Sequence, residues 1–141
     1  MSAFRDISVA LNKKLQAYSV ANTRPVAYEN IEYEPIVGTM YLRPTLLPAQ
    51  SSQAGLGTAG QERHEGVYQI DVFAPSNKPL VVALTEADEI ANYFTRGLTL
   101  TYNSVNVRVN TASQGRANRD GAWFVIPVFI DYLSYTTART A

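Results

Sequence analysis

The stretch GLGTAG, residues 55–60, has the G-x-G-x-x-G spacing of a turn that binds the pyrophosphate of a dinucleotide. Such a turn needs a buried strand before it and a helix after it, because the helix N-terminus meets the phosphates. The flanking residues here are QSSQA and QERHEG, and a strand-like run follows instead of a helix. The motif therefore predicts no cofactor. Its glycines and serines indicate either a flexible loop that orders on a partner, with Leu56 as its single apolar anchor, or a disordered insertion in which Leu56 is incidental.

The single histidine, His64, is the next candidate for chemistry. Glu62 and Glu65 are its neighbours, but no second pair of residues has ligand spacing, so we interpret His64 as a solvated loop residue and predict no metal site. Serines and aspartates are plentiful, yet nothing resembles a nucleophile elbow. We predict no catalytic residue and a protein that is not an enzyme.

Two groups of charged residues allow other interpretations. Glu86, Asp88 and Glu89 form an acidic cluster within a helical pattern, which we interpret as a solvated helix face. Arg116 and Arg119 lie in a polar segment, where they are either solvated or available to a phosphate backbone or a protein partner.

Composition limits the remaining classes. The chain has 141 residues, which fits one domain over residues 1–141, and 12 basic residues balance 12 acidic ones. This balance argues against a dedicated nucleic-acid binder. Cysteine is absent, no signal peptide is visible, and the longest apolar stretch, 122–130, is too short to span a bilayer, so no membrane partner is expected.

The hydrophobic pattern predicts the elements that position these residues. Phe4, Ile7, Leu11, Leu15 and Tyr18 share one helical face, and a second stripe runs from Leu80 through Leu84 to Phe94. The expected elements are a helix over 2–20, a strand over 40–49 that contains Pro44 and so lies at an edge or is bulged, a loop over 50–66, a strand over 67–75, a helix from Pro79 to Arg96, a hairpin of 98–102 and 105–110, a loop over 111–121 and a strand over 122–135. The fold class is α+β: a single mixed, mostly antiparallel sheet with two helices packed on one face and a long loop between the early strands.

The final strand is apolar on both faces. Trp123, Val125 and Phe129 share one face, and Ile126 and Val128 are among those on the other. Val67 and Phe73 likewise point away from Tyr68 and Ile70 on the strand over 67–75. With both helices placed on one face, the other has no cover. An uncovered apolar face indicates a second sheet or a subunit interface, and in a chain this short we expect self-association.

Several stretches together resemble a known family. YLRPTLLPA, GLG, RHEGVYQIDVFAP and a helix with EADEIANYF ending in TRG are similar to the tail terminator-like proteins of long-tailed bacteriophages, from about Pro25 to Tyr135. The signature stretch is matched position by position at Arg63, Gly66, Tyr68, Gln69 and Ile70.

The resemblance implies a virion structural protein, assembled in the host cytoplasm and located at the head-proximal end of the tail. Such subunits form a ring, commonly a homohexamer, that ends polymerisation of the tail tube and offers a joining surface to a head-side connector or head completion protein. DNA passes through the lumen without sequence-specific contacts. The alternatives are another connector or tube-ring component of a siphovirus-like tail, or a small α+β enzyme or ligand-binding domain with its site under loop 50–66. The candidate assembly-interface residues are Leu56, Arg63, Val67, Phe73, Arg116, Arg119, Trp123 and Phe129.

Overall fold

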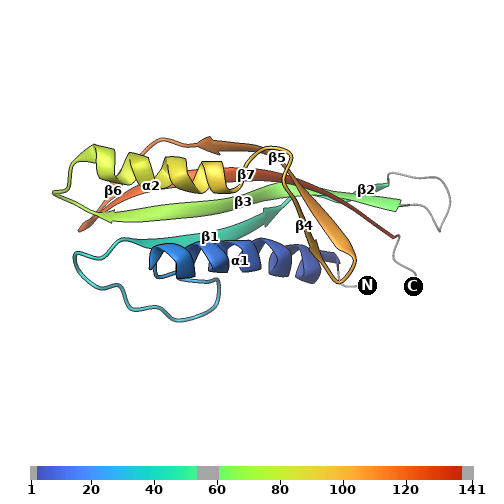
Figure 1. The fold of residues 1–141 in the computed structure, drawn as a ribbon, viewed down its shortest axis with the longest axis horizontal. Helices are drawn as coiled ribbons and strands as arrows, with labels where there is room; N and C mark the ends of the chain where they lie inside the picture. Colours follow the sequence, from blue (N-terminus) through green and yellow to red (C-terminus); the bar gives the residue numbers. More distant parts are fainter. Residues whose placement is uncertain (1–2, 54–60, 138–141) are drawn as a thin grey trace.

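The computed structural model describes residues 3–53 and 61–137. Within these residues two helices and seven strands follow one another (Figure 1). Their bounds are α1 Ala3–Asn22, β1 Tyr41–Pro48, β2 Ser52–Gln53, β3 Gln61–Pro75, α2 Leu80–Tyr93, β4 Thr99–Tyr102, β5 Val105–Gln114, β6 Asn118–Asp120 and β7 Trp123–Thr137. The chain is an α+β protein, as the sequence predicts.

The strands form one curled sheet with the order β1-β3-β7-β5-β4, while β2 pairs with β3 and β6 pairs with β7. All pairings between these named strands are antiparallel, and Val26 forms an isolated parallel bridge with Leu42. Pro44 lies in β1, an edge strand, which tolerates its missing N–H. The edge position predicted from Pro44 is therefore confirmed.

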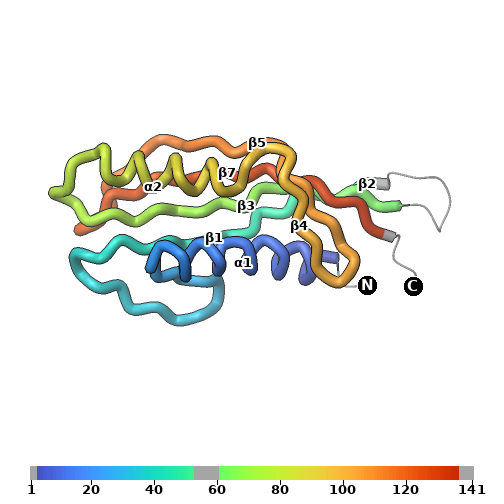
Figure 2. Tube along the Cα trace, in the orientation of Figure 1, coloured from blue at the N-terminus to red at the C-terminus, as the bar shows by residue number. Residues whose placement is uncertain are grey.

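β3 and β7 are the central pair of the sheet. They are in register over their full length, from Gln61 opposite Thr137 to Pro75 opposite Trp123. At about 3.4 Å per residue, 15-residue strands span roughly 50 Å. Figure 2 shows this pair running the length of the molecule, with the segment between α1 and β1 forming an open excursion at one end. The sheet is thus a long platform that fixes the positions of the surfaces along it.

The core lies against alternate residues of β3, β7 and β5. Tyr68 illustrates it: its hydroxyl donates to Asn12 Oδ1 of α1, and its ring lies 6.0 Å from the ring of Phe94 at the end of α2. Apolar side chains from both helices and from the strands belong to this single cluster. The members with complete burial include Ile7, Leu11, Leu15, Ile70, Val72, Ala87, Ile90, Phe94, Val107, Val128 and Ile130.

The predicted loop over 50–66 is wrong in its bounds. Gln61 to Gly66 belong to β3, and Ser52 and Gln53 pair with it as β2. QERHEG is polar and has only a weak strand preference, so its composition does not predict a strand. It forms one because the last residues of β7 supply the backbone partners. The predicted loop over 111–121 fails for the same reason, since β5 continues to Gln114 and β6 follows at Asn118–Asp120. The long irregular connection within the described chain is instead 23–40, between α1 and β1.

The apolar stripe predicted on α2 needs a second correction. Leu80 and Leu84 are exposed, while Ala83, Ala87 and Ile90 are buried together with Glu86. At 100° per residue, the buried direction is centred near Ala83 and Ile90, so Leu80 and Leu84 fall to the edge of the stripe. In this orientation Glu86 is buried on the same side of the helix.

Candidate assembly interface

One face of the sheet lies opposite the core cluster, and we call it the outer sheet face. Its exposed or partly exposed residues include Leu47, Val67, Gln69, Val125, Phe129 and Leu133, which alternate along their strands with residues that face the core. Val67 stands between Leu47 of β1 and Asp131 of β7, and Phe129 stands beside Gln69. None of these six is a member of the core cluster. Val67 and Phe129, both predicted for the interface, are partly exposed on this face.

Phe73 lies on the same face but is buried within the subunit. Its ring stacks on that of Tyr41 at 4.6 Å, and the Arg43 guanidinium covers it at 4.7 Å. Arg43 also forms an ion pair with the buried Asp71 at 3.2 Å. Trp123 meets Tyr41 edge-on at 5.1 Å and stays partly exposed. Phe73 therefore supports this end of the face from below, and Trp123 is the part of the cluster that a partner can reach.

Arg63 lies near the start of β3, where it is exposed and forms an ion pair with Glu65 at 2.9 Å. Exposed pairs of this kind contribute little stability, because water and salt screen them. Breaking this ion pair would cost little free energy, so Arg63 can instead pair with an acidic residue of another protein. Leu56, the predicted anchor of the neighbouring segment, lies outside the described residues.

His64 is not the solvated residue that the sequence predicts. It is buried, with Nδ1 2.7 Å from Ser51 Oγ and Nε2 2.8 Å from Thr136 Oγ1, and Phe4 meets its ring edge-on. It therefore joins the segment before β2 to the end of β7 beside α1. The residues beside His64 are more exposed, as expected for alternate residues of a strand. The sequence contains no signal that would pair this histidine with the hydroxyls of Ser51 and Thr136.

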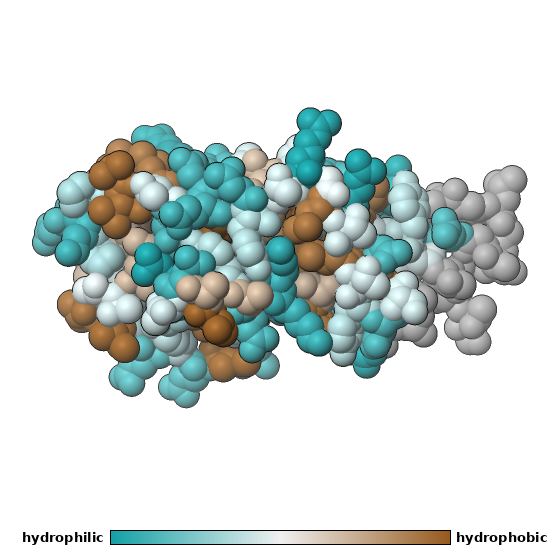
Figure 3. Space-filling view, in the orientation of Figure 1, coloured by the Kyte–Doolittle hydropathy of each residue, from teal (hydrophilic) through white to brown (hydrophobic). Residues whose placement is uncertain are grey.

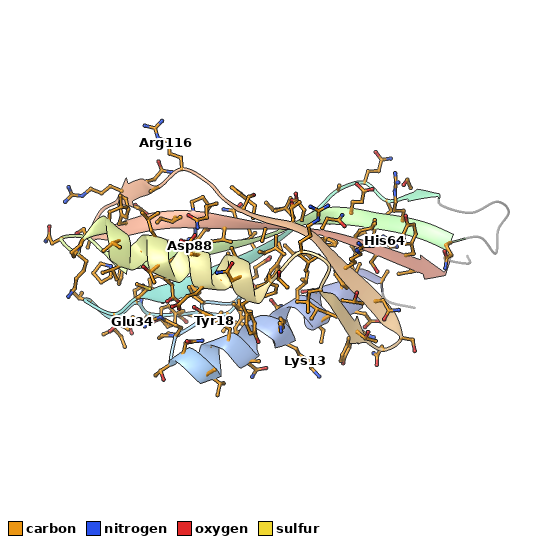
Figure 4. All side chains as sticks on the ribbon, turned by 45° about the horizontal axis from the view of Figure 1, so that its top comes forward. Lys13, Tyr18, Glu34, His64, Asp88 and Arg116 are labelled. Carbon is orange, nitrogen blue, oxygen red and sulfur yellow. The ribbon has the colours of Figure 1, made fainter. Side chains whose placement is uncertain are left out.

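Arg116 and Arg119 are exposed at the other end of the molecule, around β6. Arg119 lines a hollow of about 300 Å³ together with Lys78, Leu80 and Phe124. In Figure 4 Arg116 projects from the top edge of the molecule, away from the core. The structure thus separates the predicted interface residues into the outer sheet face, the end of β3 and the surroundings of β6.

The acidic cluster of α2 is only partly solvated. Glu86 is buried, accepts a hydrogen bond from the Tyr18 hydroxyl at 2.8 Å and lies 3.1 Å from Arg24 Nε. Burial first, and then the hydrogen bond and the charge of Glu86, raise the pKa of Tyr18 above its ordinary range. Asp88 is exposed and accepts from Gln114, and Glu89 is exposed as well. Glu86 therefore ties α2 to α1 and is structural.

Two exposed apolar surfaces were not identified from the sequence. The start of α2 exposes Leu80, Val81, Val82 and Leu84, and the 23–40 segment exposes Ile31, Ile36 and Val37. Figure 3 shows hydrophobic surface over the N-terminal half of α2 and, separately, at the lower edge where the 23–40 segment lies. The run LVVAL indicates an apolar start of the helix, but its helical spacing predicts that the leucines belong to the core.

The described residues provide surfaces for packing and polar contacts. Among residues 3–53 and 61–137, no group of three His, Cys, Asp or Glu is placed to hold a metal ion. In the same ranges no helix is long and apolar enough to cross a membrane.

Comparisons with known proteins identify the family. The family model described as "Phage tail terminator protein" matches residues 6–132. The chain belongs to the phage tail terminator protein family, whose members are structural proteins of phage tails. The resemblance noted from the sequence is confirmed.

Two solved structures share the fold. The first is 25% identical with a TM-score of 0.76, and the match covers 95% of this chain and 96% of that one. The second is a chain in the virion of a native gene transfer agent particle, which is 17% identical with a TM-score of 0.61, and the match covers 95% and 97% of the two chains. The search of curated proteins returned no match.

Proposed function

We propose that this protein is the subunit of a ring at the head-proximal end of a phage tail tube, where it ends tube polymerisation and presents the surface that joins the tail to the head. The observation that carries the proposal is the family match over 6–132, which spans nearly the whole described fold. Ring formation follows from the need of identical subunits to assemble without open-ended growth.

The outer sheet face supports an assembly role. Tyr68 contacts both helices, so we infer that α1 and α2 pack on one face of the sheet and leave Val67 and Phe129 on the other. A partly apolar sheet face without a covering layer is suited to a protein partner. In the proposed assembly, this face meets a neighbouring subunit or an adjoining tube or head-side protein. DNA passes through the lumen without sequence-specific contacts, in keeping with the balanced charge of the chain.

The first experiment is a mass measurement by analytical ultracentrifugation over a concentration series, and in assembled tails. The family resemblance gives six subunits as the expected number, and 6 × 15.5 kDa is 93 kDa. A monomer of 15.5 kDa that persists at high concentration and is also found in virions would contradict the ring.

The second experiment tests termination. Tails assembled without the protein should carry tubes of extended and variable length, and addition of the wild-type protein should restore a fixed length. Phe129→Asp should stay folded and fail to restore it, because the charge would sit on the outer sheet face. Val20→Asp is the control, since Val20 is 76% exposed on α1, away from that face. Tubes of normal length without the protein would reject the termination role and favour another connector or tube-ring component.

A further inference from the structure

Two exposed apolar surfaces of this subunit carry opposite charge at their rims. The basic-rimmed patch consists of Leu80, Val81, Val82 and Leu84 with Lys78 and Arg119 beside them. The acid-rimmed loop consists of Ile31, Ile36 and Val37 with Glu32 and Glu34 among them. Within the described residues, none of these four charged side chains forms an ion pair.

The basic-rimmed patch is a consequence of how α2 begins. Pro79 precedes the first helical residue, and the Val82 N–H donates to its carbonyl at 3.1 Å. The rotation that buries Glu86 leaves Leu80 and Leu84 outside the core, and Val81 is 63% exposed. Lys78 and Arg119 line one hollow with Leu80, so the positive charges adjoin the apolar surface directly.

The acid-rimmed loop is also a built surface. Its turn closes by a bond from the Thr39 N–H to the Ile36 carbonyl at 3.1 Å, and Gly38 adopts a φ of +86° that favours glycine. This turn presents Val37, which is 89% exposed.

β1 holds the acid-rimmed loop in place. The Leu46 N–H donates to Glu29 Oε1 at 2.5 Å, and the ring of Tyr33 lies 5.0 Å from that of Tyr41. The exposed apolar side chains of the loop are therefore held on a defined flank of the subunit.

The two surfaces lie on opposite flanks. Figure 1 shows α2 along the upper side of the molecule and the segment between α1 and β1 along its lower side, and Figure 4 shows Glu34 below α2. In Figure 3 the corresponding hydrophobic areas are separate, at the upper and lower edges of the same end. A patch on one flank of a subunit can therefore meet the opposite flank of the next copy.

We infer that the basic-rimmed patch of one subunit binds the acid-rimmed loop of the next subunit in the ring. The inference rests on the proposed ring and names its lateral contact. Opposite rim charges attract the unlike surfaces, whereas two basic or two acidic rims repel each other. Pairing is thereby directed head-to-tail, and a heterologous contact of this kind is the one that generates a ring when its rotation closes. The outer sheet face then remains available to other virion proteins.

The experiment uses two charge-reversed forms of the full chain. Form A carries Lys78→Glu and Arg119→Glu, and form B carries Glu32→Lys and Glu34→Lys. Each form alone has two rims of the same sign, so the protein concentration at half assembly should rise at least about tenfold. The control, Lys13→Glu with Arg96→Glu, changes the same number of exposed charges away from both surfaces and should assemble like wild type.

The most decisive measurement uses an equimolar mixture of forms A and B. Every contact between A and B joins opposite charges, so alternating rings should form at close to the wild-type concentration, provided the number of subunits is even. Analytical ultracentrifugation measures assembly, and circular dichroism checks that each form is folded. Wild-type rings together with normal assembly of A or B alone, or failure of folded A and B to assemble when mixed, would overturn the lateral contact but leave the ring. Absence of rings from the wild-type protein would instead reject the proposed function.

Discussion

The hydroxyl of Tyr18 on α1 donates a 2.8 Å hydrogen bond to the carboxylate of Glu86 on α2, across 68 residues of sequence. Both groups are buried, and Arg24 forms an ion pair with the same carboxylate. The two helices are thus joined by a charged hydrogen bond at a site where the sequence predicts a solvated helix face. A buried carboxylate depends on its donors, because it has lost its water.

Tyr18→Phe should lower the free energy of unfolding by about 1.5–3 kcal/mol, the usual contribution of a hydrogen bond to a charged group. Urea denaturation measures the change. Tyr93→Phe is the matched control, since Tyr93 is only partly buried and also sits between the helices, beside Lys14. Equal stability of Tyr18→Phe and wild type would mean that water replaces the hydroxyl at Glu86.

Gly66→Ala should destabilise the subunit even though Gly66 lies in a regular strand. An added Cβ would lie 2.6 Å from the Tyr132 hydroxyl oxygen and 2.7 Å from the Leu47 carbonyl oxygen, and the second of these is backbone that cannot move aside cheaply. Overpacking of this kind costs about 1–3 kcal/mol. Thermal unfolding measures it, and Gly66→Ala in a Tyr132→Phe background should recover only part of the loss, because the clash with Leu47 remains.

Tyr132 should make the subunit less stable at alkaline pH. Burial raises the pKa of Tyr132 to about 12, against an ordinary value of 10.0, so the unfolded chain loses this proton first as the pH rises. The stability that the protonated Tyr132 contributes to the folded state is fully present below pH 10 and is lost as the pH rises from 10 towards 12. Urea denaturation at a series of pH values should show a shallower fall over this window for Tyr132→Phe. An unchanged slope would place the effect in other tyrosines, such as Tyr68, whose pKa burial also raises.

Phe94→Ala should unfold the subunit before it affects assembly as such. Phe94 is completely buried at the end of α2, and truncation of such a side chain costs about 3–5 kcal/mol. Leu84→Ala, which removes a side chain from the exposed edge of the same helix, should cost under about 1 kcal/mol and should weaken assembly instead. The comparison requires unfolding curves and sedimentation of both variants. A folded Phe94→Ala with selectively lost assembly would show that the buried and exposed sides of α2 have been exchanged.

The sequence predicts the order of the main elements well, because hydrophobic spacing marks α1, β3 and β7 clearly. It fails where tertiary partners decide. QERHEG has only a weak strand preference, and pairing with β7 makes it part of β3. The sequence predicts a surface position for His64 and Glu86 because their buried partners, Thr136 and Tyr18, lie 72 and 68 residues away along the chain.

The candidate surface was predictable only in part. Alternation placed Val67 and Phe129 opposite the core, and the structure puts them on the outer sheet face. Phe73 has the same spacing, but the side chains of Tyr41 and Arg43 pack over it and bury it. Hydrophobic periodicity does not predict contacts of this kind. The exposed start of α2 depends on how the helix is rotated against the core, with Glu86 buried and Leu84 exposed. The charge of a rim depends on neighbours such as Arg119 from a distant strand.

The position of β7 has a consequence for how the polypeptide reaches its native state. β7 comes last among the described elements yet lies in the middle of the sheet, between β3 and β5. Until residues 123–137 have been synthesised, β3 lacks its longest partner and the apolar surfaces of both helices lack their platform. Folding must therefore await late closure of contacts far apart in sequence, which slows it and disfavours ordered partial structures. A chain cut short before β7 lacks the central strand of its sheet, so in the proposed ring an unfinished copy could not occupy the place of a subunit.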